Sequence, residues 1–188
     1  MVQGIFKFKA ALRLSIVLGC ALLVSGCAAP RQMNMFDTAL TSSQPQTPQL
    51  SKAIRNAKAV KAQGKRLWCV PFARDASGVD IRGNAGTWWR QAHNTYARGH
   101  DPLVGSVIAF KATRKLPMGH VAVVSQVLSD REILVDHANW SRSKISLGMK
   151  VIDVSAKGDW SAVRVASNGE DLGRVYPVDG FIWSSHLQ

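Results

Sequence analysis

The sequence predicts one α+β domain in which short helices come first and the strands of a mostly antiparallel sheet follow. Residues 69–77 and 85–97 have the residue spacing and end signals of short helices. After Pro102 the apolar residues alternate or form short runs, at 104–110, 120–128, 131–138, 149–155, 160–166 and 181–183. Helices followed by strands are typical of α+β domains. We therefore expect the N-terminal helices to pack on the sheet.

Length and composition favour a single globular domain. The chain has 188 residues, 46% of them hydrophobic, with six tryptophans, which suits a packed core. No internal repeat and no glycine-rich phosphate loop is present in the sequence. We place the folded domain at 57–188, and the weak helical spacing of 51–65 indicates a further amphipathic helix at its start.

The first 26 residues have the pattern of an export signal. Three basic residues precede the apolar run LSIVLGCALLV, which is too short to favour a membrane-spanning helix. The stretch VSGC at 24–27 resembles a bacterial lipobox, in which the cysteine is acylated and becomes the new N-terminus. We expect residues 1–26 to be removed and Cys27 to be lipidated. The protein would then be an exported lipoprotein, at the outer membrane facing the periplasm; a plain secretory signal would make it periplasmic.

Residues 27–56 then form a tether, because 28–50 are rich in Ser, Thr, Gln and Pro. Signal removal takes three basic residues and no acidic ones, which lowers the formal net charge from +12 to +9. Such a charge favours polyanions, including lipid headgroups and peptidoglycan. We expect no nucleic-acid partner, because the basic residues are scattered and no reader motif is present. The oligomeric state does not follow from the sequence.

Cys69 has no disulfide partner on this interpretation, because Cys20 leaves with the signal and Cys27 carries lipid. It is either a buried structural thiol or a nucleophile. Cys69 begins the helix predicted at 69–77, which Gly78 would end. Unpaired N–H groups and the helix dipole at that end would lower the pKa of the thiol.

A cysteine nucleophile also needs a base, usually a histidine, that takes the proton of the thiol. His120 begins an apolar strand, and on the next strand His137 and Asn139 share one face while Asp136 points to the other. An imidazole or an amide oxygen can orient a histidine base, so His137 and Asn139 both qualify. Two alternatives remain: a half-buried structural histidine, and a zinc site built from Cys69, His120 and His137.

Several segments together resemble the CHAP domain, the cysteine, histidine-dependent amidohydrolase/peptidase family of the papain-like cysteine hydrolases. They are WCVPFAR at 68–74, the Trp88–Trp89 pair, PLVGSVIAF at 102–110, GHVAVV at 119–124, DHANW at 136–140 and GFI at 180–182. The resemblance implies a papain-like fold, with a helix that carries the nucleophile packed on an antiparallel sheet. It also implies peptidoglycan as substrate, cleaved as an N-acetylmuramoyl-L-alanine amidase or a peptide endopeptidase.

By this resemblance Cys69 is the nucleophile and His120 the base, and the third role falls to Asn139 or His137. His137 stands where many CHAP domains have glutamate, so a peptidoglycan-binding or scaffolding protein with a decayed site is the alternative. We expect no metal and no cofactor, because the stretch before Cys69 lacks the carboxylates that hold calcium in some members.

Three tryptophans are candidates for substrate contact. Trp88 and Trp89 should divide between the core and a groove, where an aromatic face can stack on a sugar or peptide. Trp140 would either shield the catalytic hydrogen bond from water or pack in the ordinary way.

Overall fold

A computed structural model describes residues 47–167 and 171–184 of the chain. The predicted signal at 1–26, Cys27 and tether residues 27–46 lie outside the described residues. The helices are α1 (Pro48–Ala62), α2 (Cys69–Ser77) and α3 (Trp88–Gln91), with a 3-10 turn η1 (Ala85–Thr87) before α3. Residues 48–56, which the sequence placed in the tether, form the first part of α1. None of the described helices is long and apolar enough to span a bilayer.

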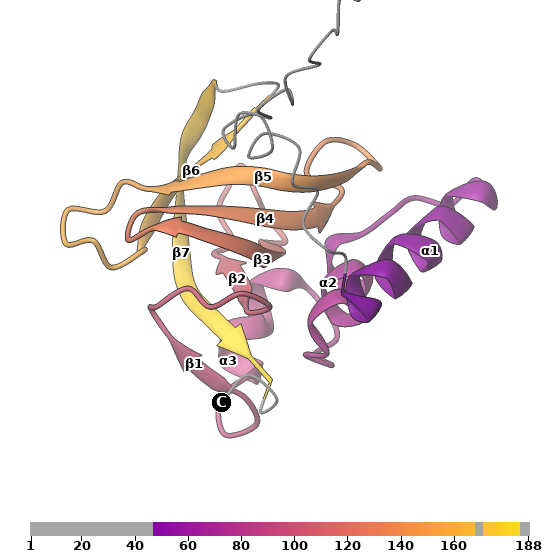
Figure 1. The fold of residues 1–188 in the computed structure, drawn as a ribbon, viewed down its shortest axis with the longest axis horizontal. Coiled ribbons are helices and arrows are strands. Elements are labelled where there is room, and N and C mark those ends of the chain that lie inside the picture. The colour runs from indigo at the N-terminus through magenta and orange to yellow at the C-terminus, as the bar shows by residue number, and fades with distance from the viewer. Residues whose placement is uncertain (1–46, 168–170, 185–188) are drawn as a thin grey trace, which may run out of the picture. The chain divides into compact units, whose positions relative to one another are not determined.

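Seven described strands form one antiparallel sheet (Figure 1). They are β1 (Ala97–Gly99), β2 (Val107–Phe110), β3 (His120–Ser129), β4 (Glu132–Ala138), β5 (Ile145–Asp153), β6 (Ala162–Ala166) and β7 (Leu172–Trp183). Their order is β1-β7-β2-β3-β4-β5-β6, and β7 also pairs with β6.

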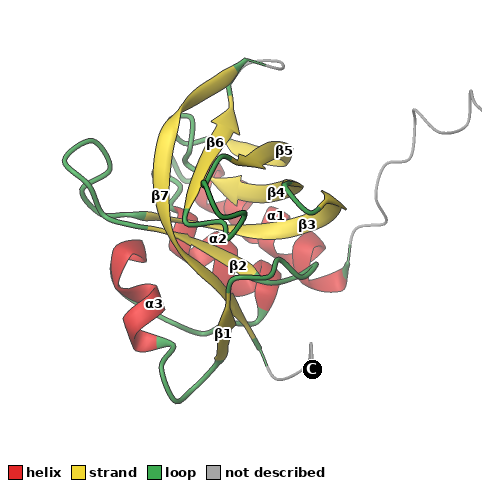
Figure 2. Ribbon diagram, turned by 90° about the vertical axis from the view of Figure 1, so that its left-hand side faces the viewer, coloured by secondary structure: helices red, strands yellow, loops and turns green. Residues whose placement is uncertain are grey.

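That second pairing closes the sheet into a six-stranded antiparallel barrel, from β7 through β2, β3, β4 and β5 to β6. The predicted α+β, papain-like fold with N-terminal helices packed on a sheet is therefore wrong. The reason lies in β7, which is 12 residues long and pairs with β6 through one part and with β2 and β1 through the other. Figure 2 shows β7 running along the barrel wall, and the irregular pairing at Ala109 and Phe110 accommodates the bend.

The barrel wall separates two hydrophobic clusters. Ile108, Ala122, Val124 and Val135 belong to the inner cluster, together with the larger side chains of Phe110, Trp160 and Phe181. Alternate residues of the same strands, such as Val107 and Val121, join an outer cluster with residues of α1, α2 and α3. All four residues of β2 are buried because both faces of this strand are covered.

Helices α1 and α2 lie together outside the barrel (Figure 1), and α2 contacts β3 and β4. Helix α2 has the predicted bounds, and it ends at Gly78 in the left-handed conformation with φ of 76°. Thr47 caps α1 by accepting from the Leu50 N–H, while Ala53 and Ala57 are buried on its inner face. Helix α2 therefore has α1 on one side and β3 on the other, and these contacts fix its start beside the barrel.

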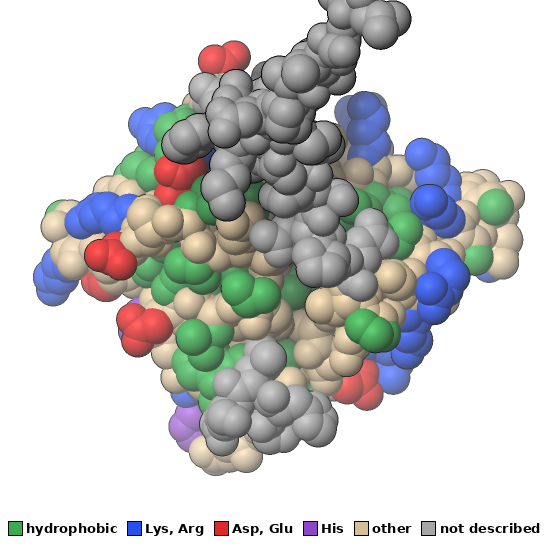
Figure 3. Space-filling model, viewed as in Figure 1, with side chains coloured by type: hydrophobic (Ala, Val, Ile, Leu, Met, Phe, Trp, Pro, Cys, Tyr) green, Lys and Arg blue, Asp and Glu red, His purple; other side chains and the backbone are tan. Residues whose placement is uncertain are grey.

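The opposite face of α1 is basic. Lys52, Arg55, Lys58 and Lys61 are exposed, and Figure 3 shows Lys and Arg side chains along the edge where α1 lies. This face follows from the helical spacing, which puts the small alanines toward the core and the long charged chains in water.

The second predicted helix is much shorter than the expected 85–97. Helix α3 ends at Gln91, and Asn94 has a left-handed backbone with φ of 66°. A left-handed residue stops an α-helix, so Ala97 is free to begin β1 and to pair with Trp183 of β7.

Candidate active site

Cys69 is the first residue of α2, as predicted. Trp68 before it is extended, with φ of −131° and ψ of 147°, and its side chain makes no cap. The first N–H groups of the helix therefore remain available around the thiol. Cys69 is partly exposed and forms no disulfide.

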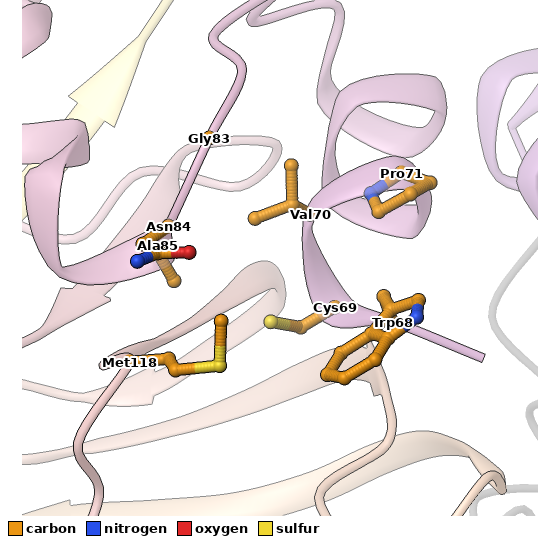
Figure 4. A pocket seen from close by; sticks show the side chains of 8 residues that line it. All are labelled: Trp68, Cys69, Val70, Pro71, Gly83, Asn84, Ala85 and Met118. Atoms are coloured by element: carbon orange, nitrogen blue, oxygen red, sulfur yellow. The ribbon is translucent and has the colours of Figure 1, made fainter. Parts of the chain in front are cut away.

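The thiol faces a pocket of about 330 Å³. Figure 4 shows the side chains of Cys69 and Met118 extending toward one another, with Trp68 alongside. Gly83, Asn84 and Ala85 form the facing wall. The lining is mainly apolar, which limits the hydration of a group held against the sulfur.

His120 and His137 form a buried pair inside the described domain. Nε2 of His120 lies 2.9 Å from Nδ1 of His137, and the two residues are 4% and 1% exposed. Nε2 of His137 lies 3.2 Å from the Met149 sulfur. Of the two orienting candidates, the structure brings His137 and not Asn139 into hydrogen-bond contact with His120.

Trp140 covers this pair. Its ring centroid lies 4.9 Å from that of His120 in an edge-on arrangement and 5.6 Å from that of His137 in a stacked one. Phe110 meets both His120 and Trp140, at 5.8 and 5.5 Å between ring centroids. Aromatic rings on several sides keep water from the hydrogen bond between the imidazoles, which combines the two roles expected of Trp140.

Asn139 supports the chain beside the site. It has a left-handed backbone with φ of 64°, and its Oδ1 accepts from the Ser143 N–H at 2.9 Å. The Ser143 hydroxyl in turn accepts from the Leu67 N–H at 2.9 Å. Asn139 is thus linked to the segment that leads into Cys69. Asp136 points away from His120, as predicted, and accepts from the Gly148 N–H at 2.7 Å.

The pKa of the Cys69 thiol is raised from its ordinary 9.0. Burial is the main cause, and the backbone N–H groups of Val121, Cys69 and Val70 act in the opposite direction without outweighing it. The expectation that the helix start would lower the pKa is therefore wrong for the net effect. The contact with Val121, which follows His120 on β3, places the thiol beside the start of that strand.

Both histidines are neutral near pH 7. Burial and then the neighbouring His137 lower the pKa of His120 well below 6.5. Burial lowers the pKa of His137 to about 4. Within the described residues no hydrogen bond joins the Cys69 thiol to His120. The resting site is thus a neutral thiol near a neutral imidazole pair, so the thiol could act as a nucleophile only with transfer of its proton.

Comparison with protein-family models finds a match in the central part of the chain. A model of the CHAP domain matches residues 60–139. The matched segment contains Cys69, His120, His137 and Asn139.

Two solved structures are similar to this chain at low identity. The crystal structure of Ly7917 is 16% identical, with 68% of this chain and 77% of that chain covered and a TM-score of 0.37. The crystal structure of Ly7917 with the hydrolyzing product of MDP is 14% identical, with 72% and 94% covered and a TM-score of 0.31. No curated protein sequence matches this chain.

The alternative of a zinc site at Cys69, His120 and His137 finds no support in the described residues. The described residues hold no group of three or more His, Cys, Asp or Glu side chains that could bind a metal ion. His120 and His137 also direct one nitrogen each at the other, at hydrogen-bond distance. One of the two nitrogens carries the proton of this hydrogen bond, so the two cannot both coordinate one metal ion.

The other tryptophan candidates lie away from the thiol. Trp88 is fully buried in the outer cluster, so its side chain offers no surface to a ligand. Trp89 packs against Arg98 and His100 and does not line the pocket at Cys69. Trp68 does line that pocket and is 45% exposed.

The sequence analysis missed Met149 and Met118. Met149 lies on β5 and reaches His137 of β4 next to an irregularity in the pairing at Val135 and His137. Met118 lies in the turn before β3, and its carbonyl accepts from the Gly86 N–H at 2.8 Å. No sequence pattern marks these methionines as functional, because their roles depend on the residues that the tertiary structure places beside them.

Proposed function

We propose that this protein is a cysteine hydrolase that cleaves an amide bond of bacterial peptidoglycan, as an N-acetylmuramoyl-L-alanine amidase or a peptide endopeptidase. The hydrogen bond between His120 and His137, beside the strand residue that contacts the Cys69 thiol, carries the proposal. The CHAP match over 60–139 supports the substrate class.

In the proposed reaction, Nδ1 of His120 takes the thiol proton as the Cys69 sulfur attacks the carbonyl carbon of the amide. The electron pair of the carbonyl moves to oxygen, where the N–H groups at the start of α2 would stabilise the oxyanion. Collapse of the tetrahedral intermediate breaks the C–N bond, and His120 gives its proton to the leaving amine. Water, activated by His120, then hydrolyses the thioester and releases the acid and the free thiol.

His137 would orient His120 without supplying negative charge. With its pKa lowered to about 4, His137 stays neutral at pH 7 and can accept a hydrogen bond from His120 in both the neutral and the protonated state. A neutral acceptor stabilises an imidazolium less than a carboxylate does. The charge on His120 would therefore be brief, from thiol attack to amine protonation and again while water hydrolyses the thioester.

The test is turnover of purified peptidoglycan by wild type, Cys69→Ala and His120→Ala, with released fragments identified by mass spectrometry. We expect both variants to lose at least about a thousandfold in rate, because nucleophile and base act as one unit. Circular dichroism checks that they fold, and His93→Ala, at an exposed position, serves as the matched histidine control. Undiminished turnover in either site variant would exclude the proposed mechanism. The fragment masses separate amidase from endopeptidase.

A non-catalytic peptidoglycan-binding protein is the second candidate, because the pKa of Cys69 is raised by burial. The two candidates differ in one measurement. A hydrolase shows fragment release that disappears with Cys69→Ala, whereas a binding protein sediments with insoluble peptidoglycan equally well with and without this substitution and releases nothing.

We further propose export, removal of residues 1–26 and lipidation of Cys27, from the signal pattern and the VSGC stretch. Cys27→Ser should then abolish incorporation of a labelled fatty acid and shift the protein from the membrane fraction. Labelling that persists in this variant would exclude Cys27 as the acceptor.

A further inference from the structure

We propose that Met149 is a positioning residue that holds the ring proton of His137 on Nε2 and thereby keeps Nδ1 of His120 free to act as the base. The inference rests on the proposed function of His120 as the base. It concerns a residue outside the CHAP-matching segment.

The sulfur of methionine fixes the direction of the first hydrogen bond. A thioether has lone pairs and no hydrogen to donate, so it can only accept. The contact of 3.2 Å between the Met149 sulfur and Nε2 of His137 is therefore a hydrogen bond only if Nε2 carries the proton. A neutral imidazole has one ring proton, which leaves Nδ1 of His137 as an acceptor.

The second hydrogen bond then has only one possible direction. Nε2 of His120 lies 2.9 Å from the bare Nδ1 of His137 and has to donate. In neutral His120 this leaves the lone pair on Nδ1. The order of donation is thus His120 to His137 to Met149, and its free end is the nitrogen that the proposed reaction needs.

Burial makes the tautomer dependent on this one sulfur. His137 is 1% exposed, so bulk water does not compete for its Nε2 proton. Met149 is half-buried against the inner cluster, which restricts the position of its sulfur. Among the described residues, His137 has no other side-chain hydrogen-bond partner than Met149 and His120.

Without the sulfur, both tautomers of His137 become accessible. If the proton moved to Nδ1, His137 would donate to Nε2 of His120, and the His120 proton would sit on Nδ1. That nitrogen could then no longer accept the thiol proton. Because a neutral hydrogen bond contributes modestly, we expect about a fivefold loss rather than complete inactivation.

The wild-type protein provides the first test. In purified full-length protein labelled with ¹⁵N-histidine, long-range proton–nitrogen NMR spectra at pH 7 report which ring nitrogen carries hydrogen. We expect His137 and His120 both to be protonated at Nε2 and bare at Nδ1. A proton on Nδ1 of His137 would overturn the proposal, and this result does not depend on whether the protein is active.

Met149→Leu, which has similar volume and no acceptor, provides the second test. We expect a mixed or reversed tautomer for His137, kcat about fivefold lower and KM unchanged. Met149→Gln, whose amide oxygen can accept, should return both the spectrum and kcat toward wild type. Val151→Ala controls for a packing change on the same strand and should alter stability but not the tautomer.

An unchanged His137 spectrum in Met149→Leu would refute the role of the sulfur. If Met149→Leu fails to fold, the wild-type and Met149→Gln spectra still decide. Failure of the proposed function would give a different result from failure of this inference. The protein would release no peptidoglycan fragments, while the NMR spectra would still show both histidines protonated at Nε2.

Discussion

At the scale of single residues, burial sets the chemistry of the site. Cys69 lies where helix N–H groups favour a thiolate, but removal of the sulfur from water has the larger effect and raises its pKa. The same effect lowers the pKa of His120 and His137, so that both remain neutral. In the proposed reaction, this site therefore rests in the uncharged state and acquires charge only while the amide is cleaved.

The buried histidines make the stability of the fold depend on pH. Their folded-state pKa values lie below the unfolded value of about 6.5, so the unfolded chain binds more protons between pH 6.5 and about 4. The free energy of unfolding should therefore be highest above pH 6.5 and fall toward pH 4. His137 alone should contribute about 3 kcal/mol to this fall. Urea denaturation at pH 7, 5.5 and 4.5 measures it.

Two variants make this prediction specific. His137→Gln should flatten the pH dependence, whereas His93→Gln, at an exposed position, should leave it unchanged. Asp136 has the opposite effect on the free energy of unfolding. Burial raises its pKa above 3.8, so just above pH 3.8 the folded state binds more protons than the unfolded chain, and this contribution falls as the pH rises. Wild-type stability that is equal at pH 7 and pH 4.5 would contradict the prediction.

At the scale of elements, the turn before β3 connects the pocket residue Met118 to His120, the proposed base. Gly119 has φ of 67°, and a Cβ there would meet the Gly86 backbone and lie 2.8 Å from the Phe110 carbonyl oxygen. Only glycine lets this turn pack against η1, where the Gly86 N–H holds the Met118 carbonyl. His120 follows directly, so the same turn positions this imidazole.

Gly119→Ala should therefore destabilise the domain by about 3 kcal/mol or more, from backbone strain together with the clash. Gly64→Ala is the matched control, because its φ is 70° and nothing lies within 4 Å of the added Cβ. That variant should lose only about 1 kcal/mol. Thermal unfolding of the two proteins compares them, and equal losses would mean that the close approach at Gly119 is not rigid.

The strand faces and the start of α2 could be predicted from sequence, and the element ends next to long-range contacts could not. His120, Ala122 and Val124 share a face as expected, because side chains alternate along any strand. The helix expected at 85–97 failed because its last residues are taken by pairing with β7. Only 181–183 of β7 was expected, since Pro177 and Gly180 interrupt the apolar pattern of the rest of this strand.

At the scale of the whole molecule, closure of the barrel creates two cores that share one wall. Ile108 packs in the inner cluster and Val107, its neighbour, in the outer cluster under the helices. Helix α2 therefore packs on strands whose other face is covered by the inner cluster. The position of the thiol depends on the inner cluster even though Cys69 does not touch it.

Ile108→Ala should cost about 2–5 kcal/mol, because it removes buried methyl groups from a fully covered strand. Leu128→Ala is the control, at 44% exposure on β3, and should change stability by less than about 1 kcal/mol. Urea denaturation followed by far-UV and near-UV circular dichroism measures both. If helices and barrel form one cooperative unit, the two signals shift together; separate transitions would show that α1 and α2 unfold on their own.

The sequence by itself determined Cys69 at a helix start and the strand faces on which His120 and His137 lie, because these features follow from short-range periodicity and end signals. The tertiary structure alone decided that the sheet closes, that His137 rather than Asn139 meets His120, and that Met149 meets His137. It also decided the direction of the Cys69 pKa shift. Strand pairing and burial join residues far apart in the chain, and no local pattern encodes their distances.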